Sequence, residues 1–222
     1  MIDQASTYAA SIDNIILLIG ALVGFWFIAA EGMLFWLIWR FRAKDGVKSE
    51  YLEGHEPHVK KWITWPHTII LVFDVFIIIG AIQVWYNVKQ RLPDDADHTI
   101  RIIGQQWAWT FQHPGVDNEL DTADDIFTVD ELHVEVDRTY IFRLEARDVL
   151  HSFSVPVFRI KQDAIPGRSI SGWFEPTMTG EYDVQCAEIC GIGHGVMAAR
   201  IHIEDAQQHA DWIRTASVGT AQ

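Results

Sequence analysis

The chain has 222 residues, of which 49% are hydrophobic and 21% are charged, and its formal net charge at pH 7 is -13. The negative charge is concentrated in residues 87–222, which hold 22 acidic and 11 basic residues, whereas residues 1–86 hold eight acidic and six basic residues. A field of this sign disfavours nucleic acid and anionic lipid headgroups as partners, and it attracts a basic protein surface. A domain kept acidic for solubility alone would show the same balance.

Two apolar segments dominate the N-terminal half. Residues 15–39 are interrupted only by Glu31, and residues 62–86 contain four exceptions: Pro66, His67, Asp74 and Gln83. Each segment is long enough to cross a bilayer as a helix, for which about 20 residues suffice. Both are apolar on all sides, which argues against a buried hairpin of a soluble protein. We therefore predict two transmembrane helices, at about residues 15–39 and 62–86, within an anchor formed by residues 1–90.

The basic residues of this half predict its orientation. All six lie between the two segments or at their edges: Arg40, Arg42, Lys44, Lys48, Lys60 and Lys61. By the positive-inside tendency this connection is cytoplasmic, so both termini and the C-terminal domain are expected on the periplasmic or intermembrane-space side. The first 14 residues contain no Lys or Arg, which is not typical of a cleaved signal peptide. Glu31 and Asp74 are costly in lipid, so we expect them to face a larger membrane partner or a watery cavity.

Residues 91–222 have the pattern of an all-β domain. Short segments rich in β-branched and aromatic residues alternate with Gly, Pro and Asp. Eight of them are expected as strands: 99–103, 107–112, 133–136, 140–144, 153–157, 169–174, 182–185 and 199–203. This number of short strands within about 100 residues predicts a Greek-key sandwich. A short amphipathic helix is expected at residues 204–215, and residues 216–222 are expected to fray.

Residues 117–125 form an acidic insertion between strands. Alternating carboxylates of this kind offer oxygen ligands to a calcium ion. The segment lacks the glycine at the sixth position and the final glutamate of an EF-hand loop. A solvated acidic loop is the favoured interpretation, with calcium binding as the alternative.

Residues 186–197, Cys-Ala-Glu-Ile-Cys-Gly-Ile-Gly-His-Gly-Val-Met, contain both cysteines of the chain. Thiolate, imidazole and thioether ligands together favour copper over hard cations. Cys186, Cys190, His194 and Met197 are spaced so that one loop could supply four ligand atoms, and the second cysteine suggests two coppers that share two sulfurs. His151 is the candidate for a further histidine from another strand. A disulfide and a zinc site are the competing interpretations.

Three further motifs accompany this loop: Gly-Gln-Gln-Trp-Ala-Trp at 104–109, Asp-Val-Leu-His-Ser-Phe at 148–153 and Asp-Ala-Ile-Pro-Gly-Arg at 163–168. With these motifs the chain resembles subunit II of cytochrome c oxidase over most of its length. The resemblance implies two membrane helices followed by a cupredoxin domain at residues 91–222. It also implies a binuclear copper centre, called CuA, that accepts electrons from cytochrome c. The electrons would pass to the haem–copper catalytic subunit I, where dioxygen is reduced; subunit I, other membrane subunits and lipid would be the neighbours.

The same resemblance implies a ligand set for this centre. Cys186 and Cys190 would bridge both coppers, and His151 and His194 would each bind one of them. Met197 would be the weak axial ligand of one copper. The backbone carbonyl of Glu188 would be that of the other, and its carboxylate is implied to bind magnesium at the interface with subunit I.

Trp107 corresponds by resemblance to an exposed tryptophan that receives electrons from cytochrome c. Strand alternation alone places either Trp107 or Trp109 in the core and the other at the surface. The chain departs from the family at Gln105, where histidine is common. It also lacks a glutamate shortly before the second helix, at the mouth of one proton path, for which Glu56 or His58 could substitute.

Two other functions are compatible with the sequence. The copper-bearing subunit of a related nitric oxide reductase would feed a different terminal reaction, and a missing proton-path glutamate would be natural there. A membrane-tethered copper-binding module without a respiratory role would need neither Trp107 nor a membrane partner.

Overall fold

The computed structural model describes residues 2–48 and 51–219. The chain divides into two compact units, one formed by residues 13–85 and the other by the first 12 residues together with the chain from Tyr86 onward. Each unit has its own architecture.

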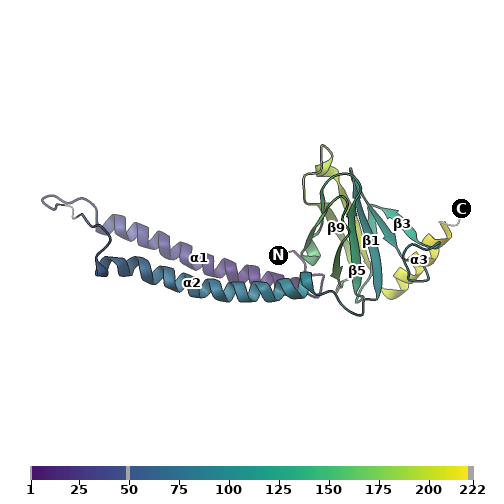
Figure 1. The fold of residues 1–222 in the computed structure, drawn as a ribbon, viewed down its shortest axis with the longest axis horizontal. Helices are drawn as coiled ribbons and strands as arrows, with labels where there is room; N and C mark the ends of the chain where they lie inside the picture. Colours follow the sequence, from purple (N-terminus) through teal and green to yellow (C-terminus); the bar gives the residue numbers. More distant parts are fainter. Residues whose placement is uncertain (1, 49–50, 220–222) are drawn as a thin grey trace. The chain divides into compact units, whose positions relative to one another are not determined.

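The first unit is a pair of long helices, α1 (Ala9–Arg40) and α2 (Pro57–Trp85), which run side by side in opposite directions (Figure 1). Both are long and apolar enough to cross a membrane. The helices begin earlier than expected from the apolar segments. Pro57 suits the first turn of a helix, and Lys60 and Lys61 are good helix formers, so helicity extends beyond the apolar stretch that the sequence marks.

The second unit is a sandwich of two five-stranded sheets that pack face to face (Figure 1). The first sheet has the order β3 (Ile126–Val129), β2 (Ala108–His113), β1 (His98–Gln105), β5 (Tyr140–Ala146) and β8 (Ile170–Phe174). The second has the order β4 (Glu131–Glu135), β10 (Ala198–Glu204), β9 (Gly180–Cys186), β6 (His151–Val155) and β7 (Ile160–Ala164). The all-β sandwich predicted from the sequence is thereby confirmed.

Alternation along the strands builds the core of the sandwich. In β10, Ala199, Ile201 and Ile203 are buried, while the residues between them lie on the outer face. Large aromatic side chains from both sheets fill the interior, among them Trp109, Phe111, Phe142, Phe153 and Phe174. Burial of each such side chain stabilises the fold by about 1.5 to 3 kcal/mol before the cost of ordering it.

Several elements differ from the sequence expectation. β3 and β7 were not expected. The segment Ile160–Ala164, which forms β7, carries a lysine, a glutamine and an aspartate and so lacks the apolar signal of a strand. The strand expected at 153–157 ends at Val155, since Pro156 begins a 3₁₀ turn (Pro156–Phe158). Helix α3 spans Ala206–Gly219, so residues 216–219, expected to fray, are helical; residues 220–222 lie outside the described residues.

Helix α3 covers a cluster of histidines at one edge of the sandwich. His113 of β2 is buried and contacts Trp212 of α3 edge to face, with ring centroids 5.0 Å apart. Burial, and then the nearby His133 and His209, lower the pKa of His113 from 6.5 to about 3. The native state therefore holds this imidazole neutral.

The buried neutral His113 predicts a loss of stability in mild acid. Below pH 6.5 the unfolded chain binds a proton at this histidine and the native chain does not. The free energy of unfolding therefore decreases as the pH is lowered from 6.5 to about 3. Between pH 6.5 and 4.5 the loss is expected to reach up to about 3 kcal/mol. Thermal unfolding of the full chain in detergent, with His113→Phe alongside, measures it: the variant should show a flatter pH dependence over this window, and identical profiles would contradict the assignment.

Candidate metal centre

The loop between β9 and β10 carries the sulfur ligands. Cys186 is the last residue of β9, and its backbone N–H donates to the carbonyl of Met197 at 3.1 Å, which closes the loop at its base. Gly191 has a φ of 129°, a backbone conformation that other residues rarely adopt, and it allows the chain to reverse there. His194 begins a 3₁₀ turn (His194–Val196) that directs the chain back to β10. The two cysteines and the methionine are buried, and His194 is half-buried.

The structure brings the expected donor atoms into one compact group. The Sγ atoms of Cys186 and Cys190 lie 3.8 Å apart. Around Cys186 Sγ lie Nδ1 of His151 at 3.9 Å and the carbonyl oxygen of Glu188 at 3.3 Å. Around Cys190 Sγ lie Nδ1 of His194 and Sδ of Met197, both at 3.7 Å. Each thiol thus has one imidazole and one weaker donor beside it.

These separations fit a metal cluster and not a disulfide. A disulfide requires two sulfurs at about 2.05 Å, and both cysteines are free. Two sulfurs bound to one tetrahedral metal at about 2.3 Å lie about 3.8 Å apart, the separation found between Cys186 and Cys190. The donor set of two thiols, two imidazoles and a thioether is the soft set that suits copper.

Protonation of the thiols sets the condition for loading. Burial, and then the adjacent Cys186 thiol, raise the pKa of Cys190 to about 11. Only the thiolate is a metal ligand, so an arriving cation must displace the proton of Cys190.

His151 is held in the orientation that a ligand needs. It is fully buried in β6, and its Nε2–H donates to Oδ1 of Asp148 at 2.8 Å, which leaves the lone pair of Nδ1 facing Cys186. Asp148 also accepts from the backbone N–H of Gln106 at 2.7 Å. Burial raises the pKa of Asp148, but the hydrogen bonds from Gln106 and His151 outweigh it and hold the pKa below its usual value, so this carboxyl is ionised.

Asp148→Asn is expected to weaken copper binding without removing any donor. The amide can no longer accept from both Gln106 and His151 as a carboxylate does, so the imidazole loses its fixed tautomer. Loss of such a supporting partner costs about 10- to 100-fold in metal affinity. Copper competition titrations with Asp94→Asn, an exposed aspartate, as control should show the loss only for Asp148→Asn; equal affinities would contradict this role.

Trp107 lies against the loop between β9 and β10 and is partly exposed, at 39%. It belongs to the two-residue turn between β1 and β2, outside the strand in which it was expected. A Cβ atom on Gly193 would lie 2.5 Å from Cδ2 of the Trp107 ring, so the glycine is what lets the indole rest on the loop backbone. Trp109 is fully buried instead, with its ring 6.0 Å from that of His151.

Glu188 contributes its backbone to the group and leaves its side chain half-buried. Its carboxylate belongs to no cluster of three converging metal-ligating side chains among the described residues. In the acidic insertion, Asp121 pairs with Arg101 at 2.7 Å and Asp124 accepts from the backbone N–H of Val116 at 2.6 Å. These two carboxylates already have donors, one from β1 and one from the backbone next to the insertion, which favours the solvated-loop interpretation over calcium binding.

Three supporting residues were not singled out from the sequence. Asp148 lies three residues before His151, in the motif at 148–153, and the motif by itself indicated no role for it. Gln106 donates from Nε2 to the carbonyl of Cys190 at 2.7 Å and so ties the β1–β2 turn to the loop. Gly193 has a φ of -90°, and its role is to leave room for the ring of Trp107.

The sandwich and its sulfur-rich loop define the class of protein: a cupredoxin-like domain that follows two helices of membrane-spanning length. Residues 98–204 match the family described as the periplasmic domain of cytochrome c oxidase subunit II. The alternative cytochrome c oxidase subunit 2 of Bradyrhizobium diazoefficiens is 30% identical, with 91% of this chain and 79% of that protein covered. Cytochrome c oxidase subunit 2 of Cereibacter sphaeroides is 27% identical, with 85% and 70% covered.

A solved structure agrees with these relatives. The periplasmic domain of subunit II of cytochrome oxidase (CoxB) of Bradyrhizobium japonicum superposes with a TM-score of 0.53 at 29% identity, covering 59% of this chain and 100% of that domain. The chain belongs to the cytochrome c oxidase subunit II family. The resemblance inferred from the sequence motifs is thereby confirmed.

Proposed function

We propose that this chain is the electron-accepting subunit of a cytochrome c oxidase. It takes electrons from cytochrome c at a binuclear CuA centre and passes them to the haem–copper subunit I, which reduces dioxygen. The observation that carries the proposal is the convergence of four donor groups around two thiols whose sulfurs lie 3.8 Å apart. All of these donors come from the protein, which leaves no open position for a substrate and favours electron transfer over bond chemistry.

The donor pairs divide between two metal positions. Cys186 and Cys190 would hold both coppers; His151 and the Glu188 carbonyl would complete one position, and His194 and Met197 the other. When bound, the copper pair supplies a one-electron relay. The chain's own residues hold the donors close together in advance, through the closed base of the loop and the hydrogen bond from His151 to Asp148.

The names of the relatives favour dioxygen as the terminal acceptor. Those compared above are cytochrome c oxidase subunits, which supports an oxidase over the nitric oxide reductase alternative.

A related structure, 31% identical with a TM-score of 0.50, is a mixed disulfide between the thioredoxin-like TlpA and a CoxB periplasmic domain. By analogy, a thioredoxin-like partner would keep Cys186 and Cys190 reduced until copper arrives.

Residues 1–90 would anchor the chain, with residues 91–222 as the extracytoplasmic domain. The basic connection between α1 and α2 supports a cytoplasmic position for it, and hence an extracytoplasmic position for both termini. Most apolar side chains of both helices are exposed within this chain, and so is Asp74. Subunit I, other membrane subunits and lipid would cover them, and the Glu188 carboxylate would bind magnesium at the interface with subunit I.

Trp107 would receive the electron from cytochrome c, since it is partly exposed and rests on the loop that holds the donors. The excess of 22 acidic over 11 basic residues after residue 86 would attract the basic surface of the donor.

Mixing the copper-loaded full chain, in detergent, with reduced cytochrome c tests the proposed function. We expect one electron to be accepted per chain at a rate that falls as ionic strength rises, because screening weakens the attraction between the two proteins. A copper-loaded chain that fails to oxidise cytochrome c would refute the proposal.

A further inference from the structure

A second group of metal-ligating side chains lies on the outer face of the other end of the β4–β10–β9 sheet. One ligand atom from each of Glu131, His133 and His202 lies within 4.8 Å of the others. Strand pairing causes this convergence, because His133 of β4 is directly opposite His202 of β10 in a parallel pair. Glu131 precedes His133 by two positions and therefore shares its face of the sheet. His202 in turn is opposite Glu181 of β9.

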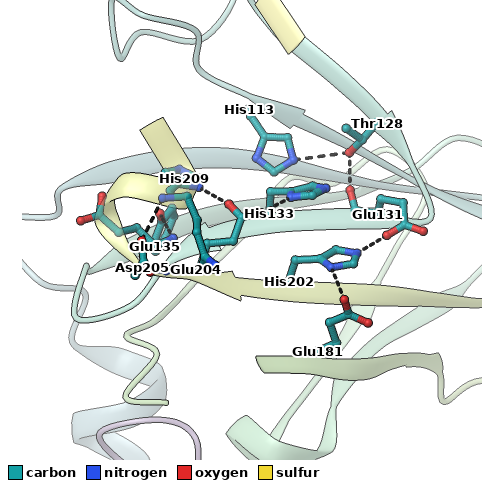
Figure 2. Close-up of polar contacts among 12 residues, drawn as sticks. His113, Thr128, Glu131, His133, Glu135, Glu181, His202, Glu204, Asp205 and His209 are labelled. Atoms are coloured by element: carbon teal, nitrogen blue, oxygen red, sulfur yellow. Dashed lines mark hydrogen bonds and ion pairs between the residues drawn. The ribbon is translucent and has the colours of Figure 1, made fainter. Parts of the chain in front are cut away.

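Each imidazole of this group is already oriented by a carboxylate (Figure 2). Nδ1 of His133 lies 2.7 Å from Oε1 of Glu204, and Nδ1 of His202 lies 3.5 Å from Oε1 of Glu181. Nε2 of His202 contacts Oε2 of Glu131. Most metal-ligating histidines have a carboxylate or similar partner on the ring nitrogen that does not bind the metal, and Glu204 and Glu181 take this place for His133 and His202.

The carboxylates around the two rings lack basic partners. Among the residues that the structure describes, no ion pair joins a lysine or arginine to Glu131, Glu181 or Glu204. Two arginines close in sequence to these residues have other partners: Arg200 pairs with Asp183 at 2.5 Å, and Arg138 with Glu135 at 3.3 Å. With neutral imidazoles this face therefore holds uncompensated negative charge, which attracts a cation.

We propose that Glu131, His133 and His202 form a binding site for a divalent transition-metal cation. This site is separate from the cysteine loop, the segment of residues 186–197 between β9 and β10. Two imidazoles and a carboxylate suit zinc, copper or nickel, and zinc commonly takes three such protein ligands and a water. The cation takes the place of the proton between His202 and Glu131, and Nε2 of His133 is the third donor, because Glu204 occupies its Nδ1.

Binding requires a small local movement. The rings of His133 and His202 are stacked, with centroids 4.6 Å apart and planes 14° apart, so their lone pairs do not yet converge. Donors on one tetrahedral zinc lie about 3.3 Å apart, so the half-buried His202 must rotate out of the stack towards the exposed Glu131. On its other side His133 stacks on Trp212 of α3 at 4.3 Å, which keeps it in place and couples the metal to the packing of α3.

Zinc titration of the full chain in detergent tests this site. The host is the Cys186→Ser/Cys190→Ser variant, in which zinc cannot use the two thiolates of the loop. We expect one zinc ion per chain and a rise in melting temperature on zinc addition, since zinc binds only the folded site. His202→Ala and His202→Gln should each weaken zinc binding by more than about a hundredfold, and Glu181→Gln, which only orients His202, by about tenfold.

Two controls make the result decisive. His55→Ala removes an exposed histidine from the segment before α2 and should leave zinc binding unchanged. Thermal unfolding without zinc shows that each variant is folded; if His202→Ala is not, His202→Gln carries the test. Failure of the host to bind zinc, or equal affinity with and without His202, would overturn the proposal and leave an ordinary network of ion pairs. Neither outcome bears on copper at the cysteine loop.

Discussion

Cys190→Ser is expected to abolish the proposed binuclear copper centre and with it the proposed oxidation of cytochrome c. Cys190 Sγ has three donor atoms within 3.8 Å, those of Cys186, His194 and Met197, so its loss opens the middle of the group. A serine hydroxyl is a hard donor that remains protonated and cannot replace a bridging thiolate. Removal of a merely supporting residue costs up to about a hundredfold in affinity, and the loss here should exceed that.

The measurement is the optical spectrum and the electron transfer rate of the copper-loaded variant. Ile189→Ser is the matched control, since it introduces the same side chain into the same loop at a position that is 81% exposed. The control should keep both the spectrum and the rate. A Cys190→Ser chain that retained the binuclear spectrum would show that the copper ligands lie elsewhere.

Gly193→Ala is expected to slow the acceptance of electrons from cytochrome c while the copper spectrum is retained. The added Cβ would lie 2.5 Å from the Trp107 ring, so the indole must move off the loop. The backbone at Gly193 has a φ of -90°, outside the left-handed region that favours glycine, so displacement of the ring is the main consequence of an alanine there. A misplacement of about 1 Å can cost about a hundredfold in rate, and we expect a loss of about tenfold or more.

The control for this prediction lies two residues away. A Cβ on Gly195 meets nothing within 4 Å, so Gly195→Ala changes the same loop without touching Trp107. Stopped-flow reduction by cytochrome c should separate the two variants, and Trp107→Ala should resemble Gly193→Ala. Equal rates for the two glycine variants would contradict a role for Trp107 in receiving the electron.

The grouping of donor atoms in the loop between β9 and β10 was predictable because these residues are close in sequence. Cys186, Cys190, His194 and Met197 fall within 12 residues, so the chain can bring them together whatever the rest of the fold does. His151 is different, since it comes from β6, and its placement beside Cys186 depends on the pairing of β6 with β9. The sequence could propose His151 only through the motif that surrounds it.

The group formed by Glu131, His133 and His202 was not predictable, because, as with His151, its members come together only through strand pairing. His133 and His202 are 69 positions apart, and only the parallel register of β4 and β10 places them opposite each other. Asp148 was visible in its motif, but its role depends on which nitrogen of His151 it contacts, and a sequence does not contain that geometry.

The fold could be predicted where the hydrophobic pattern of the sequence is strong, and the prediction was incomplete where that pattern is weak. The apolar segments and the alternation in β10 predicted helices and strands directly. β7 was missed because its outward residues are polar and its inward ones few, so its place in the sheet comes from pairing with β6. α3 continues to Gly219, beyond the end that the sequence predicted, and within this last turn the Ser217 hydroxyl donates to the carbonyl of Ile213 at 2.7 Å.

Electron paramagnetic resonance of the copper-loaded full chain tests the central claim most directly. If Cys186 and Cys190 bridge two coppers that share one unpaired electron, the hyperfine splitting will be divided equally between two copper nuclei, at two coppers per chain. A spectrum from a single copper nucleus, or a Cys186–Cys190 disulfide that persists in protein exposed to copper, would contradict the account.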